Sequence, residues 1–134
     1  MLTGQCFCGA IRYEAPEATR SQALCHCTIC RRTTGAPAVA WFTVDADAFR
    51  FTAGEPSSFR SSSHATRTFC PHCGTQLTFA DDASPDEIDV TTGSLDTPEK
   101  ALPQAHIFVA DALRWPDDLP RYQQSRNTSG PAAS

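Results

Sequence analysis

Seven cysteines gathered in three short clusters constrain this chain more than any other feature. The clusters are Cys6-Phe7-Cys8-Gly9, Cys25-His26-Cys27-Thr28-Ile29-Cys30 and Cys70-Pro71-His72-Cys73-Gly74. Thiols at such spacings on short turns are typical ligands of zinc. Four thiolates close a tetrahedral structural site, whereas three leave one coordination position open for chemistry. A four-plus-three division therefore predicts one structural zinc ion and one with an open position.

The glycines that follow Cys8 and Cys73 indicate which cysteines share a site. A zinc knuckle often needs a residue with positive φ after its second cysteine, and glycine reaches that conformation at little cost. We therefore expect the first and third clusters to form one site from Cys6, Cys8, Cys70 and Cys73. Such a site would stabilise the fold directly, since structural zinc binds with an apparent free energy of roughly 10–16 kcal/mol. The C-x-C-x-x-C run would hold the second ion through Cys25, Cys27 and Cys30.

Other divisions of the cysteines stay open at this point. The second and third clusters could form an ordinary two-knuckle ribbon, which would leave three cysteines without a site. An iron–sulfur cluster is disfavoured because the chain lacks the ferredoxin spacings. A disulfide framework is disfavoured because the cysteine count is odd and the spacings are short.

Composition limits the classes of protein to consider. A length of 134 residues fits one domain, and a net charge of −4 gives no overall basic field to attract nucleic acid. No apolar run reaches the roughly 18–20 residues of a membrane span. The N-terminus has neither the charged nor the apolar region of a secretory signal. We therefore expect a cytoplasmic protein with free or metal-bound thiols and no membrane or nucleic-acid partner.

Short alternating and β-rich segments predict an all-β fold with few or no helices. The third cluster lies between two predicted strands, as in a zinc-ribbon hairpin. Helical structure is expected only as single turns near 98–101 and 117–120. We expect one domain over residues 1–122 and a disordered tail over 123–134. The predicted strands are 10–15, 38–44, 49–52, 67–69, 75–79, 88–93 and 107–109, with 59–63 as a possible edge strand.

The histidines near the cysteines differ in what they suggest. His26 lies inside the three-cysteine run, where it could be a fourth ligand, a proton shuttle or an outward-facing polar residue. His72 lies between two ligands of a knuckle and is expected to face solvent. His106 precedes a predicted strand, where a structural or supporting role is expected.

Three arginines adjoin the cysteine clusters. Arg31 and Arg32 directly follow Cys30, and Arg67 precedes the third cluster. A guanidinium group suits the carboxylates of an anionic substrate and can lower the pKa of a nearby thiol. We take Arg31 and Arg32 as candidate ligands for substrate carboxylates. The alternative, a solvated surface charge, stays open for all three.

Together these motifs resemble the glutathione-dependent formaldehyde-activating enzyme family, also called the CENP-V/GFA domain. The resemblance runs from about residue 4 to the stretch 117–122. It implies a small zinc-stapled all-β fold similar to Mss4, also called a β-tent. It also implies a structural zinc on the first and third clusters and a catalytic zinc on the second. The matching stretches are Gly4-Gln5-Cys6-x-Cys8-Gly9-Ala10-Ile11, Cys25-His26-Cys27-x-x-Cys30-Arg31, Arg67-x-Phe69-Cys70-x-x-Cys73-Gly74-Thr75-x-Leu77 and Thr92-Gly93-Ser94-Leu95-Asp96.

The activity implied by the resemblance is the condensation of formaldehyde with glutathione to S-(hydroxymethyl)glutathione. Formally this is a carbon–sulfur lyase reaction that runs in either direction. The open zinc would lower the pKa of the thiol or polarise the aldehyde oxygen. His26 is the nearest candidate acid–base group. The alternative is a non-catalytic module that binds zinc, glutathione or a protein partner, since Mss4-like folds also serve as partner-binding scaffolds.

Overall fold

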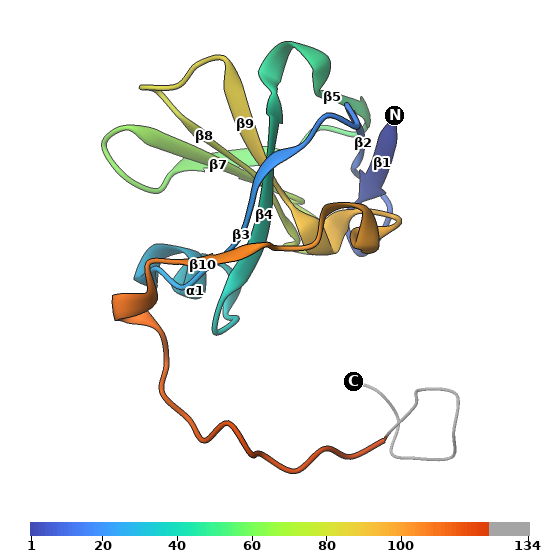
Figure 1. Cartoon of the computed structure of the whole chain (residues 1–134). Coiled ribbons are helices and arrows are strands. Elements are labelled where there is room, and N and C mark those ends of the chain that lie inside the picture. Colours follow the sequence, from blue (N-terminus) through green and yellow to red (C-terminus); the bar gives the residue numbers. More distant parts are fainter. Residues whose placement is uncertain (124–134) are drawn as a thin grey trace.

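The structure is a computed structural model of the whole chain, and it describes residues 1–123 (Figure 1). Two sheets form the body: a three-stranded sheet of order β1-β2-β5 and a seven-stranded sheet of order β10-β3-β4-β9-β8-β7-β6. The strands are β1 Leu2–Gln5, β2 Arg12–Ala15, β3 Arg20–Cys25, β4 Val39–Asp45, β5 Arg50–Ala53, β6 Ser57–Arg60, β7 Ala65–Phe69, β8 Gln76–Asp81, β9 Glu87–Thr91 and β10 Ala105–Ile107.

Helical structure is short throughout the described residues. The helix α1 covers Thr28–Thr34, and four 3₁₀ turns cover Ala46–Ala48, Thr92–Ser94, Pro98–Ala101 and Val109–Asp111. None of the helices within residues 1–123 has the length and apolar character needed to cross a membrane. The fold is all-β, as the sequence predicted.

Two separate groups of buried side chains hold the fold together. The larger core lies between the sheets, with Tyr13 from the small sheet and Phe42 and Leu77 from the large one. Cys6 and Cys70 belong to this core. The smaller group packs beneath α1 and consists of Cys25, Cys30, Val39 and Trp41, with Cys27 and Phe79 at its edge. The two predicted metal sites thus lie in different cores.

Most of the predicted strands are present. The predicted hairpin around the third cluster is confirmed, since β7 and β8 pair antiparallel on either side of it. The segment predicted as an edge strand overlaps β6, which lies at one edge of the large sheet. Of the two predicted helical turns, the one at 98–101 is confirmed. The other contains only an exposed turn at residues 117–118. The predicted tail lies, except for Gln123, outside the described residues.

The sequence analysis missed β1, β3 and α1. The strand β3 has no β-branched residue, and it is held by β4 on one side and β10 on the other. The helix α1 has only seven residues, too few to produce a visible helical period. Tertiary pairing and packing, rather than local propensity, stabilise these elements.

Candidate metal centres and active site

The first and third clusters come together as a four-sulfur group, here called the tetrad: Cys6, Cys8, Cys70 and Cys73. All four sulfur atoms lie within 4.8 Å of one another. Cys6 Sγ is 3.6 Å from Cys8 Sγ, and Cys8 Sγ is 3.8 Å from Cys70 Sγ. A zinc–sulfur bond of about 2.3 Å gives a tetrahedral sulfur–sulfur edge of about 3.8 Å. The donor set and its spacing therefore fit a tetrahedral metal ion. The four-plus-three grouping of the cysteines agrees with this geometry.

Short turns aim backbone N–H groups at the tetrad sulfurs. Ile11 N donates to Cys6 Sγ at 3.3 Å, and Cys73 N donates to Cys70 Sγ at 3.4 Å. The predicted positive φ values are confirmed, at 79° for Gly9 and 82° for Gly74. In this region of φ a side chain would strain the backbone, which explains a glycine after each cysteine pair.

The hydrogen bonds of the tetrad favour ionised sulfur at two positions. The Thr75 hydroxyl lies 3.2 Å from Cys73 Sγ and, with the Thr75 N–H, lowers the pKa of that thiol to about 5. Burial raises the pKa of Cys6, but hydrogen bonds from Ile11 N–H and neighbouring thiols outweigh it and leave this pKa lowered. At Cys8 the pull of a backbone amide is outweighed by burial and by the other thiols, which raise its pKa to about 11.

The second cluster forms a three-sulfur group, here called the triplet: Cys25, Cys27 and Cys30. Cys25 ends β3, Cys27 is the N-cap of α1, and Cys30 lies in the first turn of that helix. The Cys27 sulfur accepts a hydrogen bond from Cys30 N at 3.2 Å, so the ligand run itself starts the helix. Burial raises the pKa of Cys25 to about 12. Burial raises the pKa of Cys27 as well, but hydrogen bonds from Cys30 N–H and the other two thiols leave it lowered.

Arg67 approaches the triplet from the sheet. It is only 3% exposed, and its Nη2 donates to Cys30 Sγ at 3.6 Å. Its guanidinium group lies over the rings of Trp41 and Phe79, at 5.7 and 4.9 Å from their centroids. Burial raises the pKa of Cys30, and Arg67 opposes that rise. The interpretation of Arg67 as a solvated surface charge is therefore wrong, because the side chain is buried against a triplet sulfur.

His26 turns away from the triplet. Neighbouring residues of an extended chain point to opposite sides, and Nε2 of His26 lies 2.9 Å from Nδ1 of His106. The parallel pairing of β10 with β3 brings these residues together across 80 positions of sequence. Sequence reasoning gave no indication of this pair, because only tertiary strand pairing creates it. His72 is exposed, as predicted.

Arg31 and Arg32 have different environments. Arg32 is exposed, whereas Arg31 is half-buried and its Nε is buried without a hydrogen-bond partner among the described residues. Neither residue lines the large cavity beside the tetrad. The two arginines that the sequence grouped together are therefore not equivalent.

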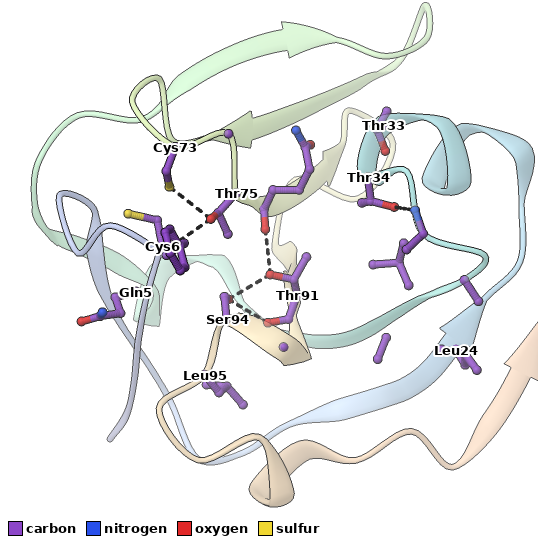
Figure 2. Close-up of a pocket in the computed structure, with 18 of the residues that line it drawn as sticks. Gln5, Cys6, Leu24, Thr33, Thr34, Cys73, Thr75, Thr91, Ser94 and Leu95 are labelled. Atoms are coloured by element: carbon purple, nitrogen blue, oxygen red, sulfur yellow. Dashed lines mark hydrogen bonds between the residues drawn. The ribbon is translucent and has the colours of Figure 1, made fainter. Parts of the chain in front are cut away.

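The large cavity, of about 910 Å³, lies between the tetrad and the C-terminal end of α1 (Figure 2). Figure 2 shows Cys6, Cys73 and Thr75 on one side of it and Thr33 and Thr34 on the other. Hydroxyl and amide groups supply most of its polar lining, and within the described residues no Lys or Arg contributes to it. The triplet cysteines themselves are not among the lining residues, but two neighbours of Cys25 are: Leu24, which precedes it in the chain, and Val39, which pairs with it across β3 and β4.

The chain matches the family described as "Glutathione-dependent formaldehyde-activating enzyme" over residues 1–111. That stretch contains both sheets and all seven cysteines. The chain belongs to this family. The resemblance that was read from the cysteine motifs is thereby confirmed.

Two individual proteins are also similar to this chain. One is a protein of Schizosaccharomyces pombe (strain 972 / ATCC 24843) described as "Uncharacterized lyase C29B12.13", 34% identical over 77 residues. The match covers 58% of this chain and 56% of the relative, so it spans little more than half the length of that protein. The other is the crystal structure of a Rhodobacter sphaeroides protein, with a TM-score of 0.61 and 25% identity. It covers 78% of this chain and 98% of that one, which supports the small Mss4-like fold expected for the family.

Proposed function

We propose that this protein is a zinc-dependent carbon–sulfur lyase that adds or removes formaldehyde, or a similar small aldehyde, at the thiol of glutathione or a related thiol. Family membership and a relative described as a lyase support the reaction class. The observation that carries the proposal is a three-sulfur group beside a complete four-sulfur group in the same chain. Three thiolates leave one coordination position for a substrate.

Zinc is the metal that suits these donor sets best. Thiolate ligands favour zinc, copper(I) and iron–sulfur clusters, and a four-sulfur tetrahedral set is typical of structural zinc. We assign one zinc to the tetrad, as the structural ion, and one to the triplet, as the catalytic ion. Zinc held by the triplet would supply a Lewis acid that stabilises a thiolate or polarises an aldehyde oxygen.

The reaction requires one bond change and one proton transfer. In the synthetic direction the thiol gives up its proton, its sulfur bonds to the carbonyl carbon, the C–O π pair moves to oxygen, and oxygen takes a proton in turn, so that no proton is gained or lost overall. The His26–His106 pair is the proposed acid–base group, because the two rings are joined by a hydrogen bond, His26 directly follows Cys25 in the chain, and His106 is exposed to solvent. Arg67 is the proposed positioning residue, because its buried hydrogen bond to Cys30 Sγ favours the ionised ligand.

The large cavity is the proposed thiol-substrate site. Its volume of about 910 Å³ falls in the range of small-molecule pockets, which is about 300–1,000 Å³. Its hydroxyl and amide lining suits the peptide groups of a glutathione-like molecule. The carboxylates of glutathione need a cation, which the lining itself does not supply. Arg31 is the proposed one: it lies outside the lining, but on the same short helix as Thr33 and Thr34, which do line the cavity. Its Nε is buried and unpartnered among the described residues.

Glutathione and formaldehyde also combine without a catalyst, so the formation of product alone does not show catalysis. The test therefore measures the rate of thiol–aldehyde exchange. Exchange spectroscopy by NMR measures the rate at equilibrium in the presence of the zinc-loaded protein. We expect saturable acceleration above the uncatalysed rate, lost in Cys27→Ala. An uncatalysed rate at all protein concentrations, with two zinc ions bound, would instead support the non-catalytic binding module.

The identity of the thiol is tested with a pair of variants and a pair of substrates. Arg31→Gln is expected to raise KM for glutathione but not for its diethyl ester, which has no carboxylates. Arg32→Gln is the matched control, since Arg32 is the exposed neighbour on the same helix. Equal KM values for glutathione in all three proteins would remove Arg31 from the site.

A further inference from the structure

The end of the described chain carries large apolar side chains that its own body leaves exposed. Within residues 1–123, twelve large hydrophobic residues are exposed, and eight of them lie between 102 and 122. Figure 1 shows that the chain after β10, which still pairs with the large sheet, runs away from the two sheets in an extended course. Residues 108–122 are here called the arm. The eight residues are Leu102, Ile107, Phe108, Val109, Leu113, Trp115, Leu119 and Tyr122.

The arm leaves the body at a defined point. β10 pairs with β3 as far as Ile107, whose carbonyl accepts a hydrogen bond from His26 N at 3.0 Å. Phe108 then adopts φ 55° and ψ 42°, a left-handed conformation that is unfavourable for a bulky residue. Beyond it, the backbone hydrogen bonds of the described residues are local, such as that from Asp111 N to Phe108 O. The arm thus leaves the body through a strained residue and is joined to itself by local backbone hydrogen bonds.

The charges of the arm limit what can cover it. It carries three acidic and two basic side chains: Asp111, Asp117, Asp118, Arg114 and Arg121. Nucleic acid and anionic membranes attract clustered basic residues, which the arm lacks. Pro116 and Pro120 disfavour a helix that could gather the apolar side chains on one face. An extended apolar segment of this kind suits a groove on a protein.

The area of the exposed side chains matches the needs of a dimer. Aromatic side chains bury roughly 150–250 Å² when fully covered, and three of the eight, Phe108, Trp115 and Tyr122, are aromatic. Together with the five aliphatic side chains, two of which lie just before the arm, they supply on the order of 800 Å² from one chain, which is what each partner contributes to a standard interface. In a two-fold dimer every contact occurs twice, so both arms bury their apolar side chains against the other chain.

The same chain carries a groove that its own arm does not fill. The cavity beside the tetrad has an exposed rim, with Phe7 at 88% exposure, and apolar lining that includes Ala36 and Leu95. Eleven extended residues, 112–122, span about 35 Å, enough to cross a small domain. We propose that each arm packs on a second copy of this chain, across the mouth of that copy's cavity. The two chains then form a two-fold dimer with exchanged arms, in which Trp115 of one chain helps to wall the cavity of the other.

The first experiment measures the mass of the zinc-loaded full chain in solution by sedimentation equilibrium over a wide concentration range. The double variant Trp115→Ser/Leu119→Ser removes two apolar contacts of the arm. Phe59→Ser is the matched control, since Phe59 is also exposed but lies on β6, outside the arm. We expect dimers for the natural chain and for the control, and monomers with two zinc ions for the double variant. A monomeric natural chain, or a dimeric double variant, would overturn the proposal.

The second experiment locates the arm. A photoreactive benzoylphenylalanine in place of Trp115 keeps an apolar ring, and mixing isotope-labelled with unlabelled protein distinguishes links between chains from links within one. Cross-links from position 115 to the cavity rim of the other copy, at Phe7 or Ala36, are expected. Links confined to the same chain, or to another face of the second copy, contradict the arrangement. Neither experiment depends on the proposed lyase activity.

Discussion

The tetrad and the triplet use the same side chain in different surroundings. The tetrad joins two turns about 60 residues apart in sequence, and Cys6 and Cys70 belong to the core between the sheets. The triplet comes from six consecutive residues, and its sulfurs lie in the small core beneath α1. A metal in the tetrad therefore links distant segments, whereas a metal in the triplet closes only a local loop.

The polar groups that contact the sulfur atoms also differ between the tetrad and the triplet. Backbone N–H groups on short turns point at the tetrad sulfurs, for example from Ile11 and His72. The triplet also receives a backbone N–H, from Cys30 to Cys27 Sγ, but in addition it receives a buried guanidinium from Arg67. Turns that hold a complete ligand set suit a structural role. An incomplete ligand set beside a charged side chain suits a site where a further ligand binds and leaves.

The largest expected effect follows from Cys70→Ala. Removal of one tetrad ligand should prevent folding, because structural zinc contributes roughly 10–16 kcal/mol and whole domains are stable by only about 5–15 kcal/mol. Circular dichroism and a thermal melt measure the outcome. Ser58→Ala on the edge strand β6 is the control for losses during expression and purification that have nothing to do with the tetrad. A cooperative melt at the normal temperature would show that the tetrad does not hold the fold.

Cys27→Ala is expected to separate metal binding from folding. The variant should keep the circular dichroism of the natural chain, bind one zinc instead of two, and lose all acceleration of thiol–aldehyde exchange. The physical reason is that the triplet lies outside the core between the sheets. Elemental analysis of chelator-free protein gives the stoichiometry. Loss of both metals, or full activity, would erase the distinction between the two groups.

Acid should release the two metals in order. In the triplet, burial raises the pKa of Cys25 to about 12 and also raises that of Cys30, and only the pKa of Cys27 is lowered, so protons compete with metal at most of its sulfurs. In the tetrad the balance is reversed: the pKa of Cys8 is raised to about 11, but those of Cys6 and Cys73 are lowered, the latter to about 5. Each additional proton that metal must displace lowers its affinity by about tenfold for every unit of falling pH.

As pH falls from neutral, the zinc content should therefore drop first to one ion and only later to none. Dialysis at a series of pH values followed by elemental analysis measures this. Cys27→Ala serves as the control, since it should show the later step alone. A single step in the natural chain, or release from the tetrad first, would contradict the contrast between the two groups.

The smallest expected effect concerns Arg67. Arg67→Met keeps an apolar side chain between Trp41 and Phe79 but removes the hydrogen bond to Cys30 Sγ. Loss of a hydrogen-bonding partner of a metal ligand typically weakens metal binding by about 10–100-fold. Chelator competition should show this loss at the triplet and an unchanged tetrad, with partial recovery in Arg67→Lys. Equal weakening at both groups would indicate a general loss of stability instead.

Local patterns in the sequence were sufficient for much of the fold. Alternation and β-rich runs predicted most strands, because side chains on a half-buried strand must alternate with period two. The glycines after Cys8 and Cys73 predicted the turn conformation, since positive φ excludes most other residues. The helix α1 was missed because its seven residues make only about two turns, too few to show a helical period.

The sequence by itself determined the candidate metal ligands and the run of Cys25, Cys27 and Cys30, because residue type and short spacing are local properties of a chain. That the first and third clusters meet was an expectation from their glycines, and it needed the tertiary structure to bring together turns about 60 residues apart. The tertiary structure alone decided which groups surround those sulfurs. The buried contact of Arg67 with Cys30 and the pairing of His26 with His106 both depend on strand order in the large sheet. Strand order brings together residues separated by 37 and 80 positions, and it reflects the packing of the whole core, which no local pattern encodes.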